Sequence, residues 1–164
     1  MSSKGFRVRG FRSDDLNRVM EINFECLPEN YSSYFYRDLY HRFPKTFLVA
    51  ESDGVIQGYI MCRIERGFSK FHSLRPTRLC HVVSIAVREP YRRKGIATEL
   101  MINAMRQGSD EYNATECYLE VRMSNEPAIQ LYEGLGFKKI KRNPDYYMDG
   151  EDAWTMAGPI AEKH

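Results

Sequence analysis

The segment at residues 88–98, Arg-Glu-Pro-Tyr-Arg-Arg-Lys-Gly-Ile-Ala-Thr, places three consecutive cations beside two small residues. Gly95 and Ala97 leave the backbone bare at the start of an expected helix, where unpaired N–H groups and the positive end of the helix dipole attract anions. The segment is too short for a Walker loop and lacks the GxGxxG pattern, which argues against nucleoside triphosphates and dinucleotides. We expect it to bind the pyrophosphate of another carrier; the alternative is a basic surface loop without a ligand.

His81 and Glu120 are of residue types that can move a proton. His81 begins the apolar run at residues 81–87, and Glu120 lies in the run at residues 116–121, on the polar side of its strand. A right-handed strand–helix–strand crossover would make the two runs adjacent and parallel, so that both side chains face one cleft and hold a water molecule. The alternatives are an ordinary strand-end histidine and a glutamate that pairs with Arg122 or another neighbour. Two such ligands alone make a poor zinc site.

Strands and helices must position these residues, and the hydrophobic pattern switches repeatedly between a period of two and a period of 3.6. The expected element order is βααβββαβαββ. The expected strands span residues 6–11, 46–51, 55–64, 81–87, 116–121, 137–141 and 153–157, and the expected helices span residues 13–27, 31–43, 96–112 and 128–135. Antiparallel hairpins come first and a crossover later. This order predicts an α/β fold (α+β mixed), with a mixed, mostly antiparallel central sheet and helices on both faces.

The first helix and the segment at residues 66–79 carry distinct local signals. Ser13 should cap the helix, and its apolar face should carry Leu16, Val19, Met20 and Phe24. Residues 66–79 contain Gly, Ser and Pro without any hydrophobic period. This composition predicts a loop.

The chain has 164 residues, 43% of them hydrophobic and 28% charged, which predicts a single globular domain over residues 1–164. Its 24 basic and 22 acidic residues give a net charge of +2, so we expect no nucleic-acid partner. No apolar run approaches the roughly 20 residues of a membrane span, and the start does not resemble a signal peptide. Cys26, Cys62, Cys80 and Cys117 form no CxxC pair and lie in or beside apolar runs. These features predict a cytoplasmic protein with reduced thiols in its core.

Two motifs carry a resemblance to a known family. The pattern R-x-x-G-x-A at residues 92–97, between an expected strand and helix, resembles the acetyl-coenzyme A motif of the GCN5-related N-acetyltransferases (GNAT). The pattern N-x-x-A-x-x-L-Y-x-x-x-G-F at residues 125–137 resembles the second motif of that family. Residues 27–31, 81–87 and 146–153 resemble the catalytic subunit of the NatA-type N-terminal acetyltransferases, above all its archaeal stand-alone members.

The resemblance implies a GNAT fold and an enzyme that moves the acetyl group of acetyl-CoA directly to the free N-terminal α-amino group of a protein within a ternary complex. Ser, Ala, Thr and Met starts are the implied substrates. The implied partners are the N-termini of nascent or mature proteins and the ribosome, without nucleic acid, a membrane, a metal or a required auxiliary subunit. Ser2 of this chain, exposed once Met1 is removed, is itself such a start.

The resemblance, together with the local chemistry of the basic turn and of the pair His81 and Glu120, assigns the site residues. Acetyl-CoA would contact Ile85, Ala86, Val87, Arg92, Arg93, Lys94, Gly95, Ile96, Ala97, Thr98, Asn125 and Tyr132. The peptide would contact Leu27, Glu29, Tyr31, Tyr146 and Tyr147. The catalytic residues would be His81 and Glu120, which hold the water that accepts the amine proton. Glu29 would be an alternative base or the determinant of first-residue preference. Tyr132 would protonate the leaving thiolate.

The chemistry of the amine separates the candidate reactions. An α-amino group has a pKa near 8 and a lysine side chain one near 10.4, a gap of about 2.5 units or roughly 3.4 kcal/mol. A weak base or a water relay therefore suffices for N-terminal acetylation, whereas lysine acetylation needs a stronger base. The alternatives are a RimI-type acetyltransferase dedicated to one ribosomal protein, a lysine acetyltransferase, and an acetyl-CoA-binding adaptor without catalysis.

Overall fold

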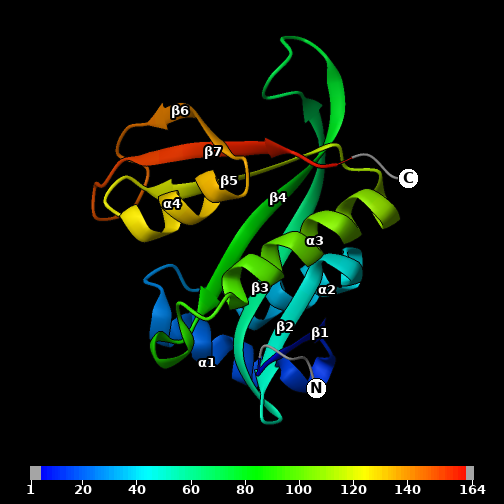
Figure 1. Ribbon diagram of the computed structural model, residues 1–164, viewed down its shortest axis with the longest axis vertical. Helices are drawn as coiled ribbons and strands as arrows, with labels where there is room; N and C mark the ends of the chain where they lie inside the picture. The colour runs from blue at the N-terminus through cyan, green and yellow to red at the C-terminus, as the bar shows by residue number, and fades with distance from the viewer. Residues whose placement is uncertain (1–4, 162–164) are drawn as a thin grey trace.

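The computed structural model describes residues 5–161, so Ser2 lies outside the described residues. Its strands form one seven-stranded sheet in the order β1-β2-β3-β4-β5-β7-β6, in which only the β4–β5 pair is parallel (Figure 1). The strands are β1 (Arg7–Gly10), β2 (Phe47–Ser52), β3 (Val55–Phe68), β4 (Pro76–Val87), β5 (Glu116–Arg122), β6 (Lys138–Asn143) and β7 (Ala153–Pro159). The helices are α1 (Leu16–Cys26), α2 (Ser33–Arg42), α3 (Ile96–Tyr112) and α4 (Glu126–Gly134). The expected mixed, mostly antiparallel fold is confirmed.

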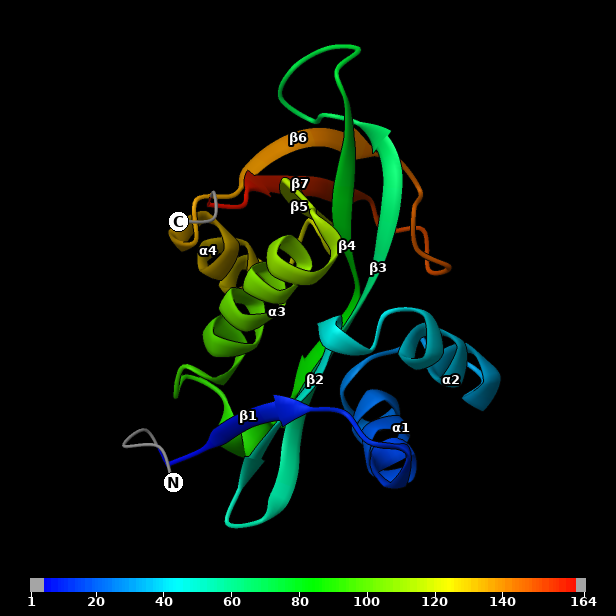
Figure 2. The same ribbon diagram turned by 90° about the vertical axis from the view of Figure 1, so that its right-hand side faces the viewer.

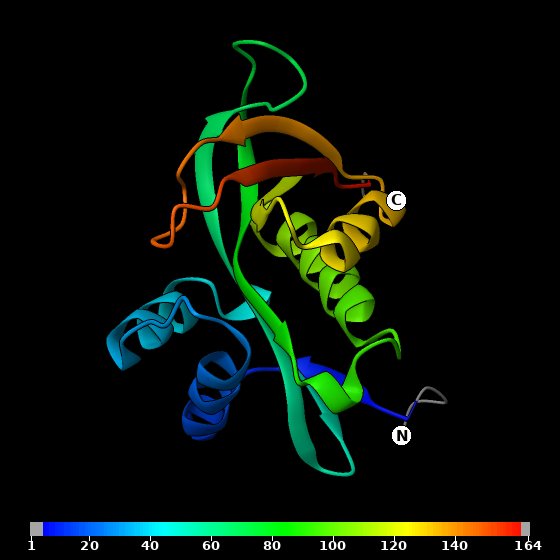
Figure 3. The ribbon, with the colours of Figure 1, turned by 90° about the vertical axis from the view of Figure 1, so that its left-hand side faces the viewer.

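The helices cover both faces of the sheet, with α1 and α2 on one side and α3 and α4 on the other (Figures 2 and 3). Leu100 and Ile129 belong to the core on the α3 side, and Ile22 and Leu39 to the core on the α1 side. Each helix is amphipathic and buries one apolar stripe against the sheet. None of the helices within residues 5–161 is long and apolar enough to cross a membrane.

Half of the segment expected to be a loop, residues 66–79, is strand. Strand β3 continues to Phe68 and β4 begins at Pro76, so the two form a long hairpin that projects from the sheet (Figure 1). The connecting residues are held in place because the buried carboxylate of Glu116 accepts hydrogen bonds from the Ser69 hydroxyl and, at 2.8 Å, from the Lys70 N–H. Pro76 is tolerated since it is the first residue of its strand.

The start and the apolar face of the first helix also differ from the expectation. Ser13–Asp15 form a 3₁₀ turn, and the α-helix begins at Leu16. Phe24 is 79% exposed, because the buried stripe passes through Ile22 and Asn23. One step along a helix rotates the side chain by about 100°, which carries Phe24 off this stripe. Because Asn23 is polar, the hydrophobic pattern of the sequence did not place it on the buried face of the helix.

Strand β4 has an irregular course next to the expected site. A register shift against β3 adds one residue to β4, so that Val83 bulges. The parallel pairing with β5 ends at His81 and Tyr118, although β4 continues to Val87 and β5 to Arg122. The two strands therefore diverge beyond His81, as Figure 1 shows. Because β4 already begins at Pro76, His81 lies within this strand and does not begin it.

All four cysteines are free thiols. Cys62, Cys80 and Cys117 lie buried on the adjacent strands β3, β4 and β5, as expected of core cysteines. Cys26, at the end of α1, is only partly buried. The expectation of a core position is therefore wrong for Cys26.

Candidate active site

A cavity of about 810 Å³ lies where β4 and β5 diverge. Its walls are the end of α1, the end of β4, the turn before α3, the first turn of α3 and helix α4. All residues expected to contact the cofactor line it except Lys94, whose ammonium lies 5.6 Å from the ring centre of Tyr91. Leu27, which was expected at the peptide, lines the same cavity. Six lining residues were not among the expected contacts, although all of them except the first lie within the segments at residues 88–98 and 125–137: Cys26, Glu89, Tyr91, Pro127, Ala128 and Leu131.

The turn before α3 has the backbone geometry and charge to bind an anion. Gly95 caps α3 at a φ of +89°, and no atom lies within 4 Å of the point where a side chain would begin. Only glycine adopts this left-handed conformation without strain. The bare start of a 17-residue helix then offers N–H groups and the positive end of the helix dipole. With the exposed cation of Arg93 beside it, this end of the cavity fits a ligand that bears phosphates.

Arg92 has a different position from its neighbour. Its Nε donates a hydrogen bond to the carbonyl of Val87 at 2.7 Å, which ties the turn to the end of β4. One nitrogen of this guanidinium is thus committed to the protein backbone. Both Arg92 and Arg93 are exposed, and we infer that Arg92 in addition shapes the cavity, because its Nε is held at the end of β4.

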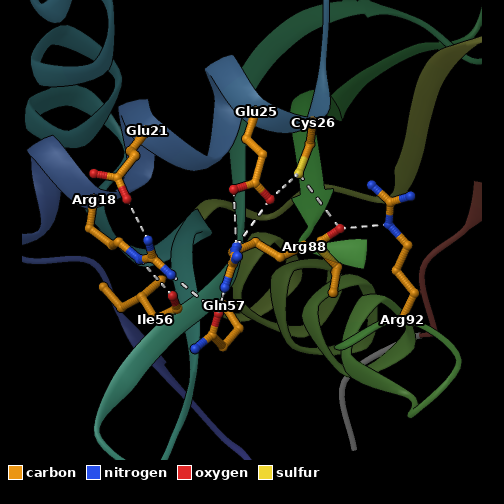
Figure 4. A network of polar contacts seen from close by, with 9 residues as sticks. Arg18, Glu21, Glu25, Cys26, Ile56, Gln57, Arg88 and Arg92 are labelled. Atoms are coloured by element: carbon orange, nitrogen blue, oxygen red, sulfur yellow. Dashed lines mark hydrogen bonds and ion pairs between the residues drawn. The ribbon is translucent and has the colours of Figure 1, made fainter. Parts of the chain in front are cut away.

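A polar network fastens the end of α1 to the same turn (Figure 4). Arg88 donates hydrogen bonds to Glu25 and to Gln57, both at 3.0 Å. The thiol of Cys26 lies 3.8 Å from the carbonyl oxygen of Val87. Burial raises the pKa of this thiol, so it stays protonated and donates. These partners are 31 to 63 residues apart, so no local sequence signal could have indicated them.

His81 has a carboxylate at each ring nitrogen. Its Nε2 lies 2.7 Å from Oε1 of Glu120, and its Nδ1 lies 2.9 Å from Oε2 of Glu65. The ring stacks on Tyr118 with the ring centres 4.2 Å apart and the planes 5° from parallel. The structure thus brings His81 and Glu120 into direct contact, where a water-mediated contact was expected. Glu65 was missed because β3 was expected to end at residue 64.

The two loops expected to flank the peptide meet at Arg122. Its guanidinium donates to Glu29 at 2.7 Å and to Asp149 at 2.8 Å, and lies 4.1 Å from the ring centre of Tyr147. Glu29 comes from the loop between α1 and α2, and the other two residues come from the loop between β6 and β7. One cation at the end of β5 therefore connects both loops. Arg122 does not pair with Glu120, which was the alternative for that carboxylate.

The loop tyrosines lie close to the histidine cluster. The Tyr31 hydroxyl donates to the carbonyl of Val83, at the bulge of β4, over 3.4 Å. Burial first, and then the nearby Glu120 carboxylate, raise the pKa of Tyr146. The Tyr146 ring packs edge-on against Tyr147 with the ring centres 4.9 Å apart. Aromatic rings from both loops thus border the polar cluster and limit its contact with water.

Helix α4 contributes Tyr132 and Asn125 to the cavity wall. Tyr132 is buried, and burial raises the pKa of its phenol, so the hydroxyl stays protonated and can donate a hydrogen bond. The side-chain oxygen of Asn125 accepts a hydrogen bond from the N–H of Ala128 at 3.3 Å. Asn125 therefore caps α4 as well as lining the cavity.

The arrangement provides a cavity with an anion-binding end where β4 and β5 diverge, and a cluster of titratable side chains on the preceding part of β4 that could accept a proton. The cavity side supplies a helix start and cations, and the cluster supplies an imidazole between two carboxylates. Within residues 5–161, no group of three His, Cys, Asp or Glu side chains is placed to hold a metal ion.

Known proteins share this fold and much of this sequence. Residues 16–137 match the family model described as the Acetyltransferase (GNAT) family. The N-alpha-acetyltransferase of Saccharolobus solfataricus is 51% identical over 158 residues, which cover 96% of this chain and 95% of that protein. The crystal structure of Ard1 from Thermoplasma volcanium has a TM-score of 0.82 at 29% identity and covers 96% of this chain and 99% of its own. A chain of the NatC complex bound to Gag peptide and CoA has a TM-score of 0.83 at 25% identity, with coverages of 95% and 99%.

Proposed function

The chain belongs to the GNAT acetyltransferase family and is an acetyl-CoA-dependent acetyltransferase, and from this premise we propose that its acceptor is the free α-amino group of protein N-termini. The observation that carries the proposal is the course of β4. This strand bears His81 in contact with Glu120 and, a few residues further on, the backbone of Ile85–Val87 that lines the cavity. The proposed weak base thus lies on the same strand as the cavity for the acyl donor, four residues before Ile85, which would suit an amine that needs little activation.

Acetyl-CoA supplies an acetyl group activated as a thioester, and the chain holds it in place. The N–H groups at residues 95–98 and the cation of Arg93 would bind the phosphates. The N–H of Val87 would donate to the acetyl carbonyl and stabilise the charge that develops there. Tyr132 would donate its phenolic hydrogen to the leaving thiolate, whose pKa near 8.5 requires no stronger acid.

The amine proton passes to the pair of His81 and Glu120. A terminal amine with a pKa near 8 is already about one tenth neutral at pH 7, so a base of moderate strength suffices. Most of the rate would come from holding the amine and the thioester in position for direct attack. Glu29 is the alternative base, but its carboxylate is paired with Arg122, which favours a role in substrate selection.

The peptide would enter between the two loops that Arg122 connects. Leu27, Glu29 and Tyr31 on one side and the two tyrosines 146 and 147 on the other would contact its first residues. A carboxylate at this entrance favours Ser, Ala and Thr starts over large apolar ones. The substrates would be nascent or mature proteins in the cytoplasm, with the ribosome as a partner and without a required auxiliary subunit or metal.

Release of free CoA measures this function directly. Peptides that start with Ser, Ala, Met-Leu or Met-Glu are compared with an N-blocked peptide that offers only lysine. We expect kcat/KM for the Ser peptide to exceed that for the blocked peptide by about 300-fold, which is the 3.4 kcal/mol difference between the two amines. Faster lysine acetylation would instead support the lysine-directed alternative. Activity on a single ribosomal-protein sequence would support a dedicated acetyltransferase. Binding of acetyl-CoA without turnover would support an adaptor without catalysis.

Glu29→Val separates substrate selection from base catalysis in the same assay. If Glu29 selects the first residue, the variant loses kcat/KM on Ser peptides and keeps or gains it on Met-Leu peptides. An equal loss on both peptides would make Glu29 the general base.

A further inference from the structure

Glu65 on β3 contacts His81 at the ring nitrogen that does not face Glu120. We propose that Glu65 is a positioning residue: it keeps a hydrogen on Nδ1 of His81, directs Nε2 at Glu120, and so makes the His81–Glu120 pair a single base with one exchangeable proton. The proposal rests on the proposed function, in which this pair accepts the amine proton. Glu65 acts through the ring and not on the amine.

The contacts of Glu65 indicate that its carboxylate is ionised. Its Oε2 accepts hydrogen bonds from Nε of Arg63 and from Nδ1 of His81, both at 2.9 Å, and its Oε1 accepts one from the Tyr118 hydroxyl. Burial alone would raise the pKa of Glu65, but the hydrogen bonds from Tyr118, Arg63 and His81 outweigh burial and lower the pKa. An ionised carboxylate only accepts hydrogen bonds, and its 2.9 Å contact with Nδ1 is much shorter than the 3.4 Å contact of Nδ1 with the Arg63 guanidinium, so we assign a hydrogen to Nδ1 of His81.

A hydrogen on Nδ1 leaves Nε2 as the ring nitrogen that exchanges a proton. The 2.7 Å contact between Nε2 and Oε1 of Glu120 requires one hydrogen between these atoms. That hydrogen lies on Nε2, as imidazolium facing carboxylate, or on Oε1, as carboxylic acid facing imidazole, and both forms hold the same single proton. The contact is thus the proton-carrying form of the pair.

The proton balance follows from these two forms. The pair that has lost its proton accepts one from the amine. The N–H bond of the amine breaks, and the hydrogen comes to lie between Nε2 of His81 and Oε1 of Glu120. Glu65 keeps its charge throughout, and that charge stabilises the proton-carrying form of the pair.

Other groups around the ring modify this effect without replacing it. Besides the two carboxylates, several charged and titratable groups face the ring or its partners. They are Arg63 on β3, the buried Cys80 on β4, Tyr118 on β5 with Lys70 behind it, and Tyr31, Tyr146 and Tyr147 from the two loops. The arginine lies 3.4 Å from Nδ1 and offsets part of the carboxylate charge. Burial raises the pKa of all three loop tyrosines, so they stay neutral where the pair titrates.

Glu65→Gln tests the proposal because it keeps the size of the side chain and removes the charge. The loss of a charge in contact with an imidazole changes its proton affinity by about one pKa unit. The pair then loses its proton at lower pH and is a weaker base. We expect kcat at pH 8 to fall about tenfold, the acidic limb of the kcat–pH profile to move about one unit lower, and the KM for acetyl-CoA to stay within about twofold.

Two further variants serve as a control and as an independent test. Glu51→Gln removes a carboxylate of similar exposure that pairs with Arg9 on β1, away from the cluster, and should leave both kcat and its pH profile unchanged. Tyr118→Phe removes a hydroxyl that shares the charge of Glu65 and keeps the ring that stacks on His81. It should move the acidic limb to higher pH, the opposite direction from Glu65→Gln.

Nuclear magnetic resonance of ¹⁵N-labelled histidine provides a readout that does not depend on turnover. In the wild-type protein Nδ1 of His81, assigned with His81→Ala, should stay protonated through the titration, and Glu65→Gln should lower the midpoint. A loss of kcat that is equal at every pH, an unmoved midpoint, or an Nδ1 without hydrogen would overturn the proposal. Absence of N-terminal acetylation by the wild type would refute the proposed function instead, and the titration would still decide the role of Glu65.

Discussion

Tyr59 and Tyr36 are buried tyrosines of the same core, but only one hydroxyl has partners. The Tyr59 hydroxyl accepts a hydrogen bond from Asn23 at 3.0 Å and lies 2.7 Å from the Ser84 hydroxyl. The same Asn23 amide donates to the carbonyl of Glu29 at 3.1 Å, so this network holds the loop that carries Glu29. Among residues 5–161, the Tyr36 hydroxyl is buried without a hydrogen-bond partner. Removal of the hydroxyl should therefore have opposite effects at the two positions.

The structure sets the size of the effect. Tyr59→Phe leaves one N–H of Asn23 and the hydroxyl of Ser84 without partners, and these side chains are only 1% and 6% exposed. An unsatisfied buried polar group costs about 1–3 kcal/mol, and removal of the phenolic hydroxyl recovers about 1 kcal/mol of its own desolvation. The expected loss is about 3 kcal/mol in the free energy of unfolding, or about 9 °C in Tm for a chain of this length. Tyr36→Phe should leave Tm unchanged or raise it.

Scanning calorimetry of the wild type and the two variants measures these shifts, and steady-state kinetics measures their consequence at the site. Because the network holds the loop of Glu29, Tyr59→Phe should raise the KM for the peptide several-fold and leave the KM for acetyl-CoA unchanged. Equal Tm shifts for the two variants would refute the assignment of the hydrogen bonds. A large drop in Tm with an unchanged peptide KM would refute the link between the network and the loop.

Four further outcomes are expected. His81→Ala and Glu120→Ala should each lower kcat about 100-fold and the double variant little more, because the pair acts as a unit; a loss near 10⁴-fold in the double variant would mean separate roles. Arg93→Ala should raise the KM for acetyl-CoA about tenfold without changing the peptide KM, and an unchanged KM would place the phosphates elsewhere. Tyr132→Phe should lower kcat about 100-fold with both KM values unchanged, unless a different group protonates the thiolate. Burial raises the pKa of Tyr59 to about 12, above the value near 10 in the unfolded chain. Its contribution to the free energy of unfolding is therefore complete below about pH 10 and is lost as pH rises through 12. Denaturant titrations at alkaline pH should show a smaller loss of stability for Tyr59→Phe than for the wild type.

Local signals in the sequence determined most of the fold and half of the site. The cation-rich turn before α3 is where it was expected, and it lines the cavity because glycine at a helix start needs no tertiary contact to expose its N–H groups. The alternation of residues in β5 correctly separated Glu120 from the buried face, since side chains in a strand alternate by geometry alone. The crossover rule placed β4 and β5 side by side and so brought His81 to Glu120. These features depend on a few neighbouring residues or on a general rule of chain connection.

Tertiary structure alone decided the divergence of β4 and β5, the bulge at Val83, the second carboxylate at His81, and the pairing of Glu29 with Arg122. Each depends on the register between strands or on side chains that are far apart in the chain. Hydrophobic periodicity indicates which face of a sheet a side chain occupies, but not which residues of two strands pair or where a bulge interrupts the pairing. The hairpin at residues 66–79 was missed for a related reason. Its Gly, Ser and Pro residues disfavour a strand locally, but continuous pairing between β3 and β4 and the buried carboxylate of Glu116 outweigh that preference.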